Sequence, residues 1–483
     1  MQRPPTTNGR GPTSPGAVPG LGGARPARLT PRRTGPRALQ GLPVPREPVR
    51  SGRRGAWLLA AVAVLGASIA GAGALSLGRD GAPPAGPLAV RNADIRFFEA
   101  RAGRDPLSAA DRAQVAGLYL QRARDTGDMD DYGRAQVWAE SSLAIRRDRN
   151  GKAQLVLASS LLARHRFPEA LAAAGDLVSR DPNEPAYVGL LGELELEMGD
   201  YEEARRVFQS LDPWRANLAV APRLARWAEI EGYPDVARRL LNEALARATE
   251  QSDLPAEQHA WFALRVGDFE LRQGRFPAAR AALERGLAVA PRDGRLHAAM
   301  ARLEAASQRW KRARRYAREA VRLAADPATL SLLGDVEAAL GHRAAAESAY
   351  AAVESLAAER PEPFNRQWTL HRLDHGRHLG ETVALLRREI AVRGDVYGYD
   401  QLAWGLYRTG ALADARAASD AALRMGTQDP MLFFHAGMIA RALGDTSAAR
   451  RDLAHALELN PHFHHWFADT ARAALDSLDV ERR

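Results

Sequence analysis

The sequence of 483 residues contains no cysteine and only two lysines, Lys152 and Lys311. The lack of cysteine excludes a thiol nucleophile, a disulfide framework and any cysteine-ligated zinc or iron–sulfur centre. Neither lysine stands in the phosphate-loop motif G-x-x-x-x-G-K-[ST], and the motifs H-E-x-x-H and G-x-S-x-G are also missing. These absences favour a protein that is not an enzyme and that needs neither a metal nor another cofactor.

Positive charge is confined to the start of the chain. The formal net charge is +9, yet residues 1–54 alone hold 11 Arg and a single acid, Glu47. The remaining residues therefore contain 56 basic and 57 acidic side chains and are nearly neutral. Because nucleic-acid binding depends on clustered positive charge, this distribution removes the main reason to expect a nucleic-acid partner.

Residues 1–54 also contain 11 Pro and 9 Gly and no aromatic residue. Such a segment cannot bury enough apolar surface to offset the entropy of the chain, so we predict a disordered tail. An uncharged run follows from Ala56 to Leu77, and we predict a transmembrane signal anchor over 55–78. A helix of about 22 residues spans about 33 Å, which is enough to cross a bilayer.

Arginines are dense before this run and balanced by acids after it. The positive-inside rule therefore places the tail in the cytoplasm and the rest of the chain on the periplasmic or extracellular side. The alternative is a signal peptide cleaved near the small residues Ala70 to Ala74, which would export the same C-terminal part.

A pattern with a period close to 34 residues begins at about residue 108, after an expected linker at 79–107. Its clearest mark is an alanine in the second half of each unit, where two helices must approach closely. This alanine recurs at Ala135, Ala170, Ala204, Ala237, Ala279, Ala313, Ala346, Ala415 and Ala449. The doubled spacing of 69 residues between Ala346 and Ala415 contains one irregular unit, at about 361–394.

The segments RVGDFELRQGRFPAARAALERGLAVAP (265–291) and LFFHAGMIARALGDTSAARRDLAHALELNP (432–461) each combine an apolar–small pair, a turn glycine, the packing alanine and a final proline. In these features the chain resembles the tetratricopeptide repeat (TPR) family of helix–turn–helix units. The resemblance implies an all-α, right-handed superhelical solenoid of about ten helix pairs over 108–463, with a capping helix in 464–483. It also implies that the protein holds other proteins or peptides.

In this family the concave surface is lined by the second, fifth, ninth and twelfth positions of each first helix. The ninth position alternates in charge over five units: Glu193, Arg226, Asp268, Arg302 and Asp335. Two interpretations stay open. The series forms a mixed-charge surface that reads a peptide, or it forms a ladder of ion pairs between first helices about 10 Å apart.

The last two units place large apolar side chains at groove-facing positions: Tyr397, Trp404, Tyr407, Met431, Phe434 and Met438. Exposed aromatic and methionine side chains on a concave face suit an apolar peptide or helix. The alternative is that several of them pack against the C-terminal helix, expected at Phe467–Leu478.

The irregular unit contains His371, His375 and His378 at helical spacing. On one helix these imidazoles would share a face and could bind a metal ion, which gives a metal-dependent enzyme or metal-binding protein as a second hypothesis. However, Gly376 falls where the family turns between its helices, which would separate His378 and favours a solvated, irregular repeat.

The sequence as a whole predicts a membrane-tethered, non-enzymatic TPR scaffold that binds envelope or membrane proteins. The structural alternative is a spacer that self-associates into a homo-oligomer.

Overall fold

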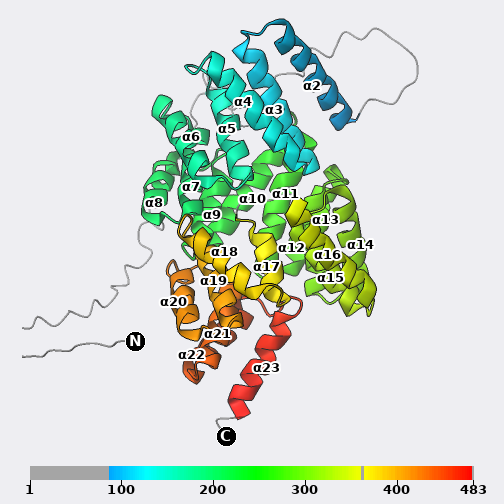
Figure 1. The fold of residues 1–483 in the computed structure, drawn as a ribbon, viewed down its shortest axis with the longest axis vertical. Helices are drawn as coiled ribbons and strands as arrows, with labels where there is room; N and C mark the ends of the chain where they lie inside the picture. Colours follow the sequence, from blue (N-terminus) through cyan, green and yellow to red (C-terminus); the bar gives the residue numbers. More distant parts are fainter. Residues whose placement is uncertain (1–85, 360–363, 481–483) are drawn as a thin grey trace, which may run out of the picture. The chain divides into compact units, whose positions relative to one another are not determined.

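The computed structural model describes residues 86–359 and 364–480, which all belong to one packed unit. The predicted tail (1–54) and transmembrane segment (55–78) lie outside these residues. The described part forms 22 α-helices and no strand (Figure 1). Within it, no helix is both long enough and apolar enough to cross a bilayer.

Twenty of these helices form ten antiparallel pairs that follow one another along the chain, as expected. The first helices of the pairs are α3 (Ala109–Thr126), α5 (Gly151–Ala163), α7 (Pro185–Met198), α9 (Ala221–Ile230), α11 (Ala256–Arg272), α13 (Gly294–Ala306), α15 (Pro327–Ala339), α17 (Arg366–Asp374), α19 (Val396–Arg408) and α21 (Pro430–Ala442). The second helices are α4 (Met129–Ile145), α6 (Phe167–Arg180), α8 (Tyr201–Ser210), α10 (Pro234–Glu250), α12 (Phe276–Val289), α14 (Trp310–Leu323), α16 (Arg343–Glu359), α18 (Leu379–Ile390), α20 (Leu412–Ala422) and α22 (Thr446–Leu459). A short 3₁₀ helix, η1 (Asp212–Trp214), follows α8.

One further helix stands at each end of the pairs. The C-terminal helix α23 (Phe467–Val480) packs on α22, as the sequence predicts. The expectation of a linker over 79–107 is corrected, because this stretch contains the helix α2 (Pro87–Arg104). Ile95 of α2 is buried against α3, and the Tyr119 hydroxyl donates a hydrogen bond to Glu99 at 2.6 Å. The sequence pattern missed α2 because this helix lacks the repeat signature.

The packing alanines lie where the sequence places them. All nine are buried at the contact between the two helices of their pair, with exposed fractions of 0–3%. In the irregular eighth pair, Thr382 takes this position at the fourth residue of α18 and is fully buried. Its hydroxyl donates to the carbonyl of His378 at 2.9 Å, which satisfies the polar group inside the helix. The eighth unit is therefore a complete pair whose signature residue has changed.

The array also makes lateral contacts between pairs that are five units apart. The turn after the first helix of an early pair meets the loop that follows the second helix of a late pair. Gly394 N donates to Met198 O at 3.0 Å, and Thr427 Oγ1 donates to Ile230 O at 2.7 Å. Asn460 Nδ2 donates to Leu271 O at 3.1 Å, and a Cβ on Gly127 would lie 2.9 Å from Ala324 Cβ. Pairs 1, 3, 4 and 5 thus dock on pairs 6, 8, 9 and 10.

Candidate functional site

The first helices of the early pairs surround an interior cavity of ≈ 720 Å³. Its wall is built from α3, α5, α7, α9 and α11, with single residues from α4, α8 and α13. Large apolar side chains form part of the wall: Leu162, Leu190, Leu196, Leu254, Trp261 and Phe262. A hollow of this size with mixed apolar and polar walls is the usual form of a binding site.

Several charged groups of the wall form ion pairs. Arg223 binds Glu193 at 2.8 Å, across the contact between α7 and α9. Arg272 forms an ion pair with the buried Glu229, and Arg226 lies 3.9 Å from the same carboxylate. Burial alone would raise the pKa of Glu229, but Arg272 and Arg226 outweigh it and hold this pKa below its ordinary value.

The lateral contacts bring α19 to the edge of this wall. The Arg226 guanidinium lies 4.9 Å from the centre of the Tyr397 ring and 3.4 Å from its hydroxyl oxygen. Burial raises the pKa of Tyr397 to about 12, so the phenol stays neutral. Close by, Arg393 forms an ion pair with Glu197, a residue of the cavity wall. Residues of the late pairs thus hold two lining residues, Arg226 and Glu197, although the lining itself comes from the early pairs.

Two guanidinium groups of the wall stand apart from this pairing. Within the residues that the structure describes, Arg124 of α3 and Arg265 of α11 make no hydrogen bond and no ion pair. Burial and the neighbouring Arg272 lower the pKa of Arg265, because its positive charge is poorly solvated and close to another cation. The cavity thus contains cations whose charge is not balanced by a direct partner.

Two family models, both described as tetratricopeptide repeat, match residues 155–217 with 267–328 and residues 432–463. The chain carries tetratricopeptide repeats. Among solved structures it is similar to the APC/C hetero-tetramer Cut9–Hcn1, with 11% identity over 80% of this chain and 93% of that chain, and a TM-score of 0.31. It is also similar to a tetratricopeptide repeat protein from Parabacteroides merdae ATCC 43184, with 14% identity over 53% and 98% of the two chains, and a TM-score of 0.36. No curated protein matches the chain.

The alternating charges at the ninth positions of the TPR units do not form one surface. Glu193 and Arg226 line the interior cavity. Asp268 and Arg302 bind each other at 2.6 Å, which is the rung expected of an ion-pair ladder. The prediction that Asp335 faces the groove is wrong, because this residue is buried. It accepts hydrogen bonds from Tyr350 at 2.9 Å and His465 at 3.0 Å.

The prediction of an exposed apolar groove in the last two TPR units also needs correction. Trp404, Phe434 and Met438 are buried, so they offer no free surface. The rings of Trp404 and Phe434 lie 5.7 Å and 5.0 Å from the ring of Phe467 on α23, which is the alternative left open by the sequence. Three others are partly exposed: Tyr397, which borders the interior cavity, Tyr407 and Met431.

The histidines of the eighth TPR unit separate as the turn glycine predicts. Gly376 has φ +68, and it ends the stretch that carries His371 and His375, whereas His378 is exposed at the start of α18. The expectation of a solvated unit is wrong for His371, which is buried with an exposed fraction of 2%. The part of the chain described by the structure holds no group of three or more side chains arranged to bind a metal ion.

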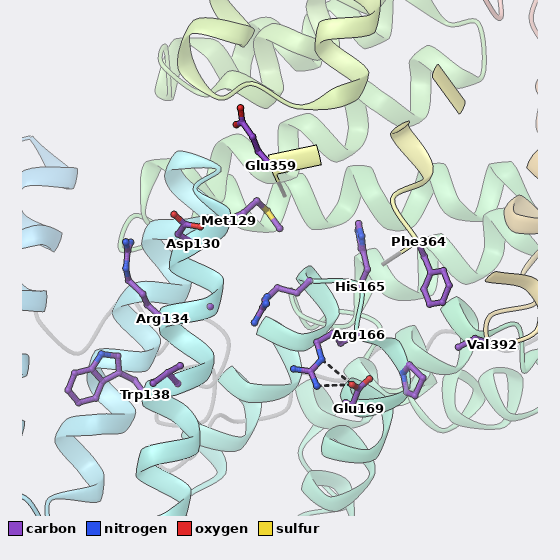
Figure 2. A pocket seen from close by; sticks show the side chains of 14 residues that line it. Met129, Asp130, Arg134, Trp138, His165, Arg166, Glu169, Glu359, Phe364 and Val392 are labelled. Carbon is purple, nitrogen blue, oxygen red and sulfur yellow. Dashed lines mark hydrogen bonds and ion pairs between the residues drawn. The ribbon is translucent and has the colours of Figure 1, made fainter. Parts of the chain in front are cut away.

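A second, more open hollow of ≈ 1010 Å³ is lined mainly by α4 of the first TPR unit and by the turn and the start of α6 in the second (Figure 2). In Figure 2, His165 and Arg166, from the turn before α6, have Phe364 to their right and Glu359 above them. Arg166 binds Glu169 at 2.8 Å, and Arg134 binds Asp131 at 2.6 Å. Since these arginines are paired, this hollow has a weaker claim as a charged binding site than the interior cavity.

The sequence reading missed three important residues of the cavity. In the family's numbering of the first helix, Asp268 is the ninth position and Trp261 is the second. Inspection of the second position in each unit would therefore have identified Trp261 as a lining residue. Arg124 and Arg265 carry no such signal. They line the cavity because of how five successive first helices curve around it.

Proposed function

We propose that this protein is a membrane-tethered, non-enzymatic scaffold whose TPR array holds a segment of a partner protein in the interior cavity. The observation that supports this function is the cavity itself, which presents apolar and charged side chains from five successive first helices around one hollow. TPR units present their first helices to a common surface, and an extended or helical peptide is the ligand that such a surface can enclose.

The membrane tether and its topology rest on the sequence alone. The uncharged run from Ala56 to Leu77 serves as a signal anchor, with the tail inside and the array on the periplasmic or extracellular side. The partners are then envelope or membrane proteins. A protease added to spheroplasts should digest the array and spare the tail, and an array that stays protected until the membrane is broken would contradict this topology.

The binding function can be tested by site-specific photocrosslinking in membranes. A photoreactive phenylalanine analogue in place of Trp261 should capture a partner protein, because this side chain lines the cavity. The same analogue in place of Trp214, which is 48% exposed in η1, is the matched control and should not capture that partner. Identical adducts from both positions would contradict binding in the cavity. Adducts formed only between copies of the chain would favour the self-associating spacer.

A further inference from the structure

Within the described residues, Arg265 has no direct ionic partner. Arg226, Arg265 and Arg272 come from two adjacent first helices, α9 and α11, and all three act electrostatically on the carboxylate of Glu229. Glu229 forms its ion pairs with Arg272 and Arg226 and acts on Arg265 only at longer range. We call Arg226, Arg265 and Arg272 the basic wall. Asp268 and Glu197 also act on these guanidinium groups, but Asp268 is bound to Arg302 and Glu197 to Arg393, so Arg265 keeps no direct partner.

The acidic side chains elsewhere in the cavity lining do not form an ion pair with Arg265. Glu184 and Glu257, the acidic lining residues that form no ion pair within the described structure, lie at the N-terminal ends of α7 and α11. Glu184 uses its carboxylate to cap the backbone N–H of Ala186 at 3.2 Å. Glu257 lies eight residues before Arg265 on the same helix, which corresponds to about 12 Å. Among the charged residues of α11 that line the cavity, Glu257 lies near the start of the helix, and Arg265 and Arg272 lie in its second half.

The apolar side chain of Trp261 lies next to Arg265 on α11. Gln258, Trp261, Arg265 and Arg272 all line the cavity, at a spacing that places them on one face of α11. Trp261 and Arg265 are four residues apart, so they are neighbours on that face. A ligand seated against both needs an anionic group for the guanidinium fork and an apolar group for the indole ring.

We propose that the interior cavity binds an acidic peptide segment, with a carboxylate of an Asp or Glu side chain seated on Arg265 and an adjacent apolar side chain on Trp261. This inference rests on the proposed function and specifies its ligand class. The carboxylate accepts two parallel hydrogen bonds from the guanidinium of Arg265, which gives this side chain the direct ionic partner that it lacks. Arg226 and Arg272 add long-range attraction while they remain bound to Glu229.

The test uses the full-length chain in mild detergent and a displayed library of short random peptides. Peptides selected on the wild-type chain should be enriched in Asp and Glu with a neighbouring apolar residue. Each selected peptide is then compared with its isosteric copy, in which Asn and Gln replace Asp and Glu. The copy should bind about tenfold more weakly or worse, as expected when one partner of an enclosed charge pair is removed.

Two variants assign the effect to Arg265. Arg265→Gln should weaken binding of the acidic peptides by about tenfold and make the acidic peptide and its isosteric copy nearly equal. Arg239→Gln removes an exposed arginine of α10 that does not line the cavity, and it should leave both affinities unchanged. Circular dichroism of both variants confirms that the fold is intact.

The outcomes separate the two proposals. Neutral or basic peptides that still lose binding in Trp261→Ala would overturn the acidic ligand class and leave the cavity as the binding site. Peptides that bind Arg265→Gln and Trp261→Ala as tightly as they bind the wild-type chain would overturn both proposals. A selection that yields no enriched peptide would also overturn both.

Discussion

The lateral contacts can be tested at Gly199, the turn residue between α7 and α8. Gly199 has φ +83, in the left-handed region that favours glycine. A Cβ added there would lie 2.5 Å from Gly394 O and 2.8 Å from Asp395 N. Ordinary contacts of this kind are at least 3.4 Å long, so Gly199→Ala must push the late loop away by nearly 1 Å.

The expected cost of Gly199→Ala has two parts. The left-handed backbone conformation costs about 1–2 kcal/mol for an alanine. Displacing the loop weakens the hydrogen bonds from Gly394 N to Met198 O at 3.0 Å and from Val396 N to the Tyr201 hydroxyl at 2.8 Å. At about 1 kcal/mol each, the two bonds add about 2 kcal/mol. We therefore expect the free energy of unfolding to fall by about 3–4 kcal/mol.

Gly410→Ala is the matched control. Gly410 occupies the same turn in the ninth pair with φ +81, and a Cβ there would meet no atom within 4 Å. This variant should lose only the conformational part, about 1–2 kcal/mol. Urea unfolding followed by circular dichroism measures both losses, and hydrogen exchange should show increased opening of residues 391–397 in Gly199→Ala alone. Equal destabilisation of the two variants would refute the lateral docking of pairs 3 and 8.

Three further predictions concern packing and pH. Ala449→Leu should overpack the contact between α21 and α22 and lower the free energy of unfolding by about 1–3 kcal/mol, with distant pairs keeping their protection from hydrogen exchange; a loss below about 0.5 kcal/mol would contradict the assigned register. Trp404→Ala should lower the melting temperature and expose Phe467 on α23 while partner recovery in a pull-down stays unchanged, because this indole is buried. Burial and the nearby His375 lower the pKa of His371 from 6.5 to about 4. Between these two pH values the unfolded chain binds a proton at His371 that the folded chain does not bind. The free energy of unfolding should therefore fall by about 3 kcal/mol as the pH drops from 6.5 to about 4. In acid-unfolding curves, His371→Gln should remove this part of the pH dependence.

The sequence determined the parts of the fold that depend on local contacts. The spacing of the nine packing alanines predicted the helix pairs, and all nine lie buried between the helices of their pair. Each pair is closed by residues less than one unit apart, so its packing leaves a periodic trace in the sequence. The trace failed at two places. Thr382 took over the role of the alanine in the eighth unit, and α2 packs on the array without carrying the repeat signature.

Only the tertiary structure decided which surfaces are free and which are filled. The lateral contacts join residues 189–197 positions apart, such as Asn460 with Leu271 and Thr427 with Ile230. They depend on small rotations that accumulate over five successive pairs, and no sequence period reports such a sum. For the same reason, the sequence could propose Trp404 and Phe434 as groove residues although α23 covers them. Nor could it show that Arg265 would face a cavity without a direct ionic partner, because that arrangement arises from the curvature of the whole array.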